Sequence, residues 1–239
     1  MTRRRWIADE VSGNRAALVG SHAAHLVRVL RAREGQEFDI VADAVVRRGT
    51  VVSISDTRVE FELREEVSAE SLAPSIHLLL AIFKFDRMEW AIEKATELGV
   101  SRIVPVVARR TDAHLASAAT KRVERWKRIT VQAAEQSRRA AVPVVAAPIK
   151  LREAVHSPAA LKIVLSESEI RTPLRTALAD HKSKGEKSLA IGPEGGWTED
   201  ELDLFHQEGW IPASLGAAVL RAETAAIAAI AIVLSEGLG

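Results

Sequence analysis

From residue 76 onward, short apolar segments alternate with stretches of helical periodicity. The first, residues 76–83, is a continuous apolar run, which predicts a strand covered on both faces. In residues 86–98 apolar side chains recur at helical spacing, which predicts a helix. Asp86 and Glu89 predict a capping box at its start, and Gly99 predicts its end. The alternation continues with a strand at 102–107, a helix at 121–139, strands at 142–147 and 161–165, a helix at 174–181, a strand at 188–191 and a helix at 199–208. This order predicts an α/β domain with a mainly parallel sheet.

Residues 38–63 follow a different pattern, made of short segments with β-like composition. The segments lie at 38–41, 49–54 and 59–63, and the last alternates strictly between apolar and polar residues. Such segments predict a small β-barrel. Before them, residues 22–33 have the spacing of a short helix, which we expect to end at Gly35.

A polar, acidic stretch at residues 65–74 separates the two patterns. It ends with a proline and is typical of a linker between domains. With 239 residues the chain is long enough for two domains. We therefore expect a β-barrel domain over residues 1–70 and an α/β domain over residues 75–239.

The composition excludes several classes of site and segment. The chain has no cysteine, so a disulfide framework, a thiolate zinc site and a cysteine nucleophile are excluded. Its seven histidines lack metal-ligand spacing, and we expect no metal. The apolar stretch at 225–234 is too short to cross a membrane, and the basic start is not followed by a secretory signal. We expect a cytoplasmic protein without a membrane segment.

The sharpest local signal is a glycine-rich turn that follows a buried strand, in residues 189–197. Gly195 and Gly196 can take positive φ and let a ligand approach the backbone, while Pro193 restricts its own φ. Ligands of open α/β sheets bind just beyond the carboxyl ends of the strands. The turn matches neither the dinucleotide fingerprint nor a phosphate loop, which disfavours NAD and ATP. A purely structural turn explains the pattern equally well.

A second glycine-bearing segment follows at residues 214–227. It joins a short apolar strand to Arg221, Glu223 and a helix that is apolar on all sides. Such a helix must be buried within the domain or against another subunit. The two loops could close over one ligand, whereas a structural pair of Arg221 with Glu223 is the alternative at this position.

These residues resemble the SPOUT-class methyltransferases, and within them the bacterial enzymes that methylate N3 of a uridine in 16S ribosomal RNA. The resemblance covers nearly the whole chain, and the order and spacing of its fragments make it specific. The matching fragments lie at residues 25–31, 87–89, 97–100, 126, 133–137, 139, 142–143, 191–196, 215–216 and 220–225.

That resemblance implies an N-terminal PUA-like β-barrel that binds RNA, followed by an α/β domain with a trefoil knot. It also implies a homodimer, S-adenosyl-L-methionine as cofactor, and 16S ribosomal RNA of the small ribosomal subunit as partner. The resemblance also implies which residues bind the cofactor. They are Gly192, Glu194, Gly195, Gly196, Leu215, Gly216, Leu220, Arg221, Thr224 and Ala225.

Methyl transfer requires uridine N3 to lie in line with the methyl group of the donor. The site must also remove the imide proton of N3 or stabilise the anion that remains on the uracil ring. Arg221 is the candidate for anion stabilisation. Glu194 or Glu223 is the candidate proton acceptor, and their places in the two loops are the basis for all three assignments.

Residues 84–150 are basic, with 14 Lys and Arg against 7 Asp and Glu, which suits a polyanion but also solvated helix faces. Without tyrosine, RNA should be held by backbone and shape contacts rather than by aromatic stacking. The sequence departs from the family pattern at two places that bear on these RNA contacts. Arg138 stands where the family usually has glycine, and the turn at 42–44 lacks a commonly seen glycine. The candidate RNA-binding residues are Arg3, Arg4, Arg5, Arg28, Arg31, Arg109, Arg110, Arg125, Arg138 and Arg139.

Three other interpretations compete with this one. A knotted methyltransferase with another target, such as a tRNA nucleotide, is disfavoured by the match across the barrel. A silent RNA-binding or assembly protein is disfavoured by the intact loops at 192–196 and 220–225. A nucleotide-dependent oxidoreductase lacks its dinucleotide fingerprint here.

Overall fold

The structure is a computed structural model that describes residues 5–43, 45–67, 75–137, 139, 141–181 and 185–236. The chain divides into two compact units. The first contains residues 1–70 and 134–142, and the second contains residues 71–133 and 143–239. Most of the expected linker, at 68–74, lies outside the described residues.

The first unit is built on a six-stranded sheet with the order β1-β4-β5-β6-β3-β2, antiparallel except for β1 with β4. Its strands are β1 (Arg5–Ile7), β2 (Glu10–Ser12), β3 (Arg15–Val19), β4 (Glu37–Ala42), β5 (Val45–Ile54) and β6 (Arg58–Glu66). The three predicted strands correspond to β4, β5 and β6. The first three strands were not predicted, because segments of three to five residues show too little alternation.

The core of this unit lies on one face of the curved sheet and contains Leu26, Ile40 and Phe61. Gly49 lets two strands come together, because a Cβ there would lie 2.5 Å from Ile40 Cγ1. The predicted helix at 22–33 is shorter than expected and consists of α1 (Ser21–Ala24) and a π-helical turn at His25–Val29. Its predicted end at Gly35 is wrong, because Arg31 already leaves the helix with φ +50°.

The turn expected at residues 42–44 lacks a glycine, and of it the structure describes residues 42 and 43. Asp43 adopts φ +51°, a left-handed conformation in which glycine is common. Aspartate is among the residues that tolerate this region best, because its short polar side chain can bond locally. Asp43 therefore replaces glycine at modest conformational cost.

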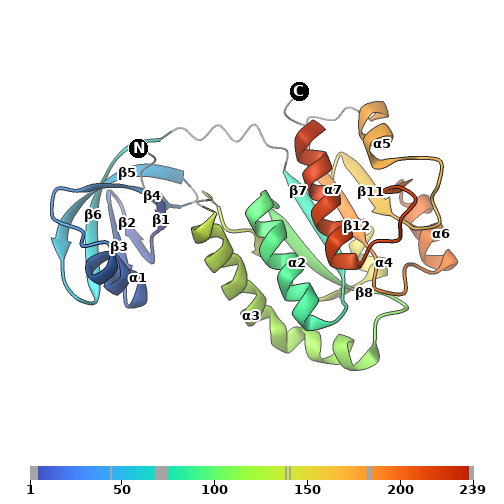
Figure 1. Ribbon diagram of the computed structural model, residues 1–239, viewed down its shortest axis with the longest axis horizontal. Helices are drawn as coiled ribbons and strands as arrows, with labels where there is room; N and C mark the ends of the chain where they lie inside the picture. Colours follow the sequence, from blue (N-terminus) through green and yellow to red (C-terminus); the bar gives the residue numbers. More distant parts are fainter. Residues whose placement is uncertain are drawn as a thin grey trace. The chain divides into compact units, whose positions relative to one another are not determined.

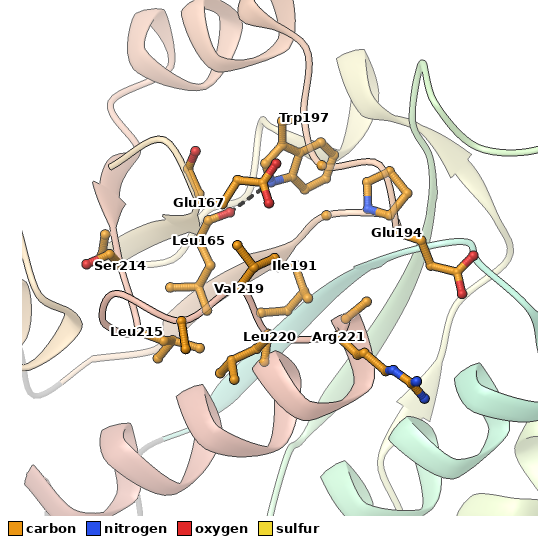
Figure 2. A pocket seen from close by; sticks show the side chains of 18 of the residues that line it. Leu165, Glu167, Ile191, Glu194, Trp197, Ser214, Leu215, Val219, Leu220 and Arg221 are labelled. Carbon is orange, nitrogen blue, oxygen red and sulfur yellow. Dashed lines mark hydrogen bonds between the residues drawn. The ribbon is translucent and has the colours of Figure 1, made fainter. Parts of the chain in front are cut away.

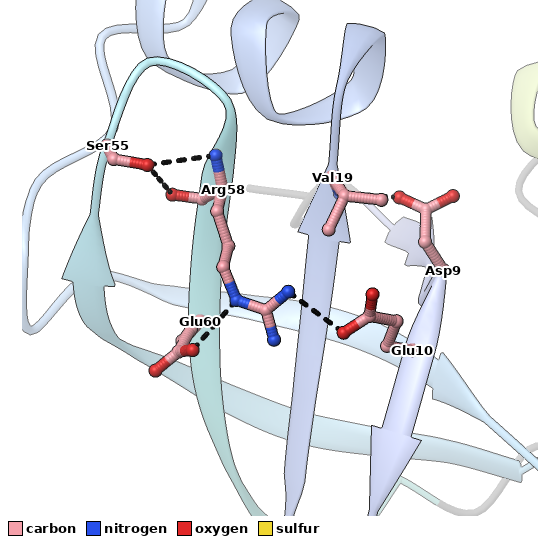
Figure 3. A network of polar contacts seen from close by, with 6 residues as sticks. All are labelled: Asp9, Glu10, Val19, Ser55, Arg58 and Glu60. Carbon is pink, nitrogen blue, oxygen red and sulfur yellow. Dashed lines mark hydrogen bonds and ion pairs between the residues drawn. The ribbon is translucent and has the colours of Figure 1, made fainter.

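Charged residues on the surface of this unit join strands that are not neighbours in sequence (Figure 3). Arg58 on β6 donates from Nε to Glu60 and from Nη1 to Glu10 on β2, each at 2.8 Å. The hydrogen bond to Glu60 is the largest cause of the raised pKa of Arg58, and the bond to Glu10 raises it further. Exposed ion pairs stabilise little, so these contacts add only slightly to the backbone pairing of β6, β3 and β2.

Residues 134–142 complete the first unit, in part through the half-buried carboxyl group of Glu135. Glu135 Oε1 lies 3.3 Å from His22 Nε2, and His22 Nδ1 lies 2.9 Å from Asp9 Oδ1. Burial is the main cause of the raised pKa of Glu135. Glu135 belongs to one of the fragments on which the family resemblance depends, so this contact gives that fragment a structural role.

The second unit contains a parallel sheet with the order β10-β8-β7-β12-β11-β13, and β9 pairs with β8 beside this path. The predicted parallel α/β domain is confirmed. The strands are β7 (Ile76–Ala81), β8 (Arg102–Val107), β9 (Val144–Val145), β10 (Ile149–Lys150), β11 (Leu161–Leu165), β12 (Lys187–Ile191) and β13 (Ile211–Ala213). β10 and β13, with two and three residues, were not predicted.

Helices cover both faces of this sheet (Figure 1). In β7, Leu78 and Leu80 pack into one core, and Leu79 and Ala81 pack into the other. The first core includes side chains of α2 (Phe85–Leu98), α3 (Ala113–Gln136), α5 (Leu174–Asp180) and α7 (Ala222–Glu236), and the second includes those of α4 (Leu151–Ala154) and α6 (Glu199–Gln207). Burial on both faces explains the continuous apolar runs of the sequence.

Three local predictions for this unit are wrong. The capping box at Asp86 does not form, because α2 begins after Lys84 without a side-chain cap, and Glu89 bonds Arg125 at 2.7 Å instead. Helix α3 begins at Ala113, eight residues before its predicted start. The short apolar strand expected before Arg221 does not form, because residues 215–220 are an irregular loop after β13. Gly99, with φ +112°, ends α2 as predicted.

Candidate active site

A cavity of about 440 Å³ lies beyond the carboxyl ends of three neighbouring strands (Figure 2). Leu165 ends β11, Ile191 ends β12 and Ala213 ends β13, and all three line it. Loops after the same strands and the start of α7 form the rest of the wall. This is the edge at which open α/β sheets bind ligands, and the volume suits a small cofactor.

The glycine-rich turn after β12 is held in one conformation by backbone and side-chain bonds. Gly196 has φ +71°, and its N–H donates to Pro193 O at 2.8 Å. Trp197 is buried and donates from Nε1 to Leu165 O at 3.1 Å, which ties the turn to the end of β11. Thr198 and Glu201 then form a capping box that starts α6. The turn is therefore rigid where it borders the cavity.

The second loop connects β13 to α7 and lies across the cavity from this turn. Ser214 N donates to Thr172 O at 2.9 Å, which fixes the start of the loop. Gly216 has φ +113°, a conformation that side-chain-bearing residues rarely adopt. Val219 and Leu220 expose 78% and 36% of their surface, so the loop presents apolar side chains for a ligand to cover.

Arg87 on α2 connects the two loops, although the sequence indicated it only as part of a resemblance fragment. Its Nη1 donates to Glu194 Oε1 at 2.7 Å, and its Nε lies 3.9 Å from Glu223 Oε1. Glu223 is buried, and its Oε2 has no hydrogen-bond partner within the described residues. Arg221 is exposed and makes no ion pair among the residues that the structure describes. The alternative pairing of Arg221 with Glu223 is therefore not formed.

The structure brings most of the predicted cofactor residues to this one cavity. Gly195 and Thr224 are not among the residues that line it. Gly195 O instead accepts a hydrogen bond from Arg110 Nη1 at 2.5 Å. Of the candidate catalytic residues, Glu194 and Arg221 line the cavity, whereas Glu223 is not among the lining residues and lies 3.9 Å from Arg87 Nε. The predicted residues in the lining are Gly192, Glu194, Gly196, Leu215, Gly216, Leu220, Arg221 and Ala225.

Sequence reasoning missed the contribution of β11. Ser166 and Glu167 follow this strand and line the cavity, as does Trp197. The strand itself was predicted, but nothing local shows that its end adjoins the end of β12. The parallel pairing of these two strands brings the residues together.

The candidate RNA-binding arginines have varied surroundings. Arg28 lies 3.4 Å from Asp56, and Arg31 and Arg109 are exposed. Arg110 holds the glycine-rich turn, and Arg125 bonds Glu89. Burial lowers the pKa of Arg139. Arg3, Arg4, Arg138 and the side chain of Arg5 lie outside the described residues.

The described residues contain neither a membrane-spanning helix nor a metal-binding cluster. No helix in the described ranges is long and apolar enough to span a membrane. No group of three or more His, Cys, Asp or Glu side chains in those ranges is arranged to hold a metal ion.

Comparison with known proteins places this geometry in context. A family model for RNA methyltransferase domains matches residues 70–234. A ribosomal RNA small subunit methyltransferase E of Synechocystis is 35% identical over 213 residues, which cover 87% of this chain and 68% of the relative. A protein of the same name from Mycobacterium bovis is 32% identical over 232 residues, which cover 93% and 87%.

Solved structures resemble the whole chain. A ribosomal RNA small subunit methyltransferase E from Neisseria gonorrhoeae, bound to S-adenosyl methionine, has a TM-score of 0.83 and 30% identity, with 98% of each chain covered. A putative methyltransferase from Legionella pneumophila, in complex with the same cofactor, has a TM-score of 0.82 and 28% identity, with 99% and 98% covered.

Proposed function

The chain belongs to the ribosomal RNA small subunit methyltransferase E family, and we propose that it methylates N3 of a uridine in 16S ribosomal RNA. It is an S-adenosylmethionine-dependent RNA methyltransferase. The observation that carries the proposal is a cavity at the carboxyl ends of β11, β12 and β13, which both glycine-bearing loops line. We further propose that the enzyme acts in the cytoplasm, on RNA of the small ribosomal subunit.

The residues of the cavity fit the cofactor. Its floor is apolar and suits an adenine ring, because Leu165, Ile191 and Ala213 are all buried. Glycines at 192, 196 and 216 keep side chains out of the space beside the backbone. The charged groups of the lining provide partners for the polar parts of such a molecule.

In the proposed reaction the bound cofactor supplies an electrophilic methyl group on a sulfonium. Glu194 lines the cavity, with 40% of its side chain exposed, and is placed to accept the imide proton of uridine N3. Arg221 stabilises the negative charge that then spreads to the uracil carbonyl oxygens. Arg87 orients Glu194 through the bond at 2.7 Å. Glu223, whose Oε1 lies 3.9 Å from Arg87 Nε, supports that arginine rather than contacting the base.

A methyl-transfer assay with isotopically labelled cofactor tests this function. Small-subunit RNA, free or in subunits that lack the modification, is incubated with the enzyme and digested to nucleosides. We expect the label in N3-methyluridine. Label in another nucleoside would exclude uridine N3 as the target, and cofactor binding without any transfer would favour a silent RNA-binding protein.

We propose that exposed arginines of both units hold the RNA backbone, as the basic segment at 84–150 favours. Because phosphate contacts release counterions, affinity should fall at least about tenfold between about 50 and about 200 mM salt. Arg109→Ala should weaken binding by roughly threefold to tenfold, since its exposed guanidinium can hold a phosphate. Arg152→Ala, an exposed arginine of α4 outside the candidate set, is the matched control. Affinity that does not respond to salt would count against the proposal.

We propose that the enzyme is a homodimer that uses α7. One side of this helix packs into the core, but Ile227 and Ala228 on the rest of it are only half-buried, and Ala231 is exposed. Ile227→Glu should convert the dimer to monomers in sedimentation experiments, because it would place a charge in the interface. Ile170→Glu, at a residue that is 84% exposed, should leave the dimer intact. A wild-type protein that sediments as a monomer would refute the proposal.

A further inference from the structure

Glu167 lies on a short loop that is fixed on both sides. Before it, Leu165 O accepts from Trp197 Nε1 at 3.1 Å, and Ser166 N donates to Ala213 O at 3.1 Å. After it, Glu169 Oε1 accepts from the N–H groups of Arg171 and Thr172 at 2.6 and 2.8 Å. The position of Glu167 at the end of β11 is therefore determined by bonds on either side.

The carboxylate of Glu167 lines the cavity beside the glycine-rich turn. A Cβ on Gly196 would lie 3.0 Å from Glu167 Oε1, so the glycine leaves the space that the carboxylate occupies. Figure 2 shows Glu167 near Trp197 and Arg221 on the opposite side of the view. The two charged groups thus border different parts of the cavity.

The charged side chains that line the cavity differ in whether they have a bonding partner among the described residues. Four charged side chains line the cavity, and two of them, Arg87 and Glu194, bond each other. Glu167 has neither a hydrogen-bond donor nor an ion-pair partner among the described residues. A carboxylate carries two acceptor oxygens and no donor, so it is suited to a ligand that offers two adjacent hydroxyl groups.

We infer that Glu167 is a specificity-determining residue that accepts hydrogen bonds from the ribose 2′- and 3′-hydroxyl groups of the cofactor, an inference that rests on the proposed function. Glu167 follows the floor residue Leu165 by two positions, which span at most about 7 Å of chain. Adenine on that floor therefore brings the ribose, to which it is bonded directly, beside the carboxylate. Acidic residues read ribose hydroxyls in the same way in other α/β folds.

The test is calorimetric titration of the full chain with three ligands. S-adenosylhomocysteine contains the ribose and the amino acid, 5′-methylthioadenosine contains the ribose alone, and the 2′,3′-dideoxy form of the latter lacks both hydroxyls. Glu167→Ala should weaken binding of the first two by about 30-fold, as expected for loss of bonds to a charged acceptor. It should not change binding of the dideoxy compound relative to wild type.

Matched variants separate recognition from folding. Glu199→Ala removes an exposed carboxylate of α6 outside the cavity and should bind all three ligands as wild type does. Glu167→Ala should melt at the wild-type temperature, because its side chain is exposed. Glu167→Gln, which retains one acceptor oxygen, should give an intermediate loss.

The remaining outcomes overturn the inference in distinguishable ways. A loss for S-adenosylhomocysteine with unchanged binding of 5′-methylthioadenosine would assign Glu167 to the amino-acid ammonium group instead. Unchanged binding of both would remove Glu167 from recognition while leaving the proposed function intact. A wild-type protein that binds none of these ligands, alone or with RNA present, would refute the proposed function and this inference together.

Discussion

Gly196→Val is expected to weaken S-adenosylmethionine binding by at least about 100-fold, because it adds a branched side chain where the cavity meets the glycine-rich turn. Gly196 has φ +71°, which a β-branched residue adopts only under strain. A Cβ at this position would also lie 3.0 Å from Glu167 Oε1 and would displace that carboxylate. Calorimetric titration with the cofactor measures the effect.

Gly209→Val is the matched control for backbone strain. Gly209 has φ +74°, close to that of Gly196, but a Cβ there would meet no atom within 4 Å. Both variants should therefore lose comparable thermal stability, while only Gly196→Val loses the cofactor. If the two variants bind the cofactor equally well, the glycine-rich turn does not form the cofactor site.

Arg221→Ala is expected to lower the turnover number by roughly 100-fold to 1000-fold, the range for removal of a group that stabilises a developing anion. The folded structure should be unaffected, because Arg221 is exposed and makes no ion pair within the described ranges. Single-turnover methyl transfer at saturating cofactor and RNA measures the loss directly. Arg221→Lys, which keeps the charge but not the planar fork, should recover part of the rate.

Cofactor titration distinguishes the two roles predicted for Arg221. Weaker cofactor binding with an unchanged rate at saturation would assign it to cofactor binding alone. Full turnover together with normal affinity would remove it from the site. Arg152→Ala should match wild type in both measurements, since its exposed guanidinium lies outside the cavity.

Elements with strong local patterns were predictable from the sequence. The strands at 102–107 and 161–165 coincide with β8 and β11, because side chains buried on both faces require continuous apolar runs. The first three strands and β13 were missed, since three to five residues carry little periodicity. The capping box at Asp86 failed because α2 already begins at Phe85, and Glu89 accepts a hydrogen bond from Arg125 on α3 instead.

The candidate site likewise contains residues that were predictable from the sequence and residues that were not. The turn at 192–196 and the loop at 215–225 were recognisable because glycine and proline restrict or free the backbone locally. Arg87 and Glu167 carry no such signal, and ordinary charged residues on a helix or loop are usually solvated. The trefoil knot and the assignment of each residue to cofactor or RNA stay predictions.

By itself, then, the sequence determined the two types of architecture, the alternation of strands and helices, and the two glycine-bearing loops, since each depends on interactions between near neighbours in the chain. Only the tertiary structure decided which strand ends adjoin. The order β7-β12-β11-β13 brings Glu167, Gly196 and Gly216 around one cavity, and helix packing brings Arg87 to Glu194. Contacts of this kind depend on the pairing of distant segments, and many sequences with the same local patterns can pair differently.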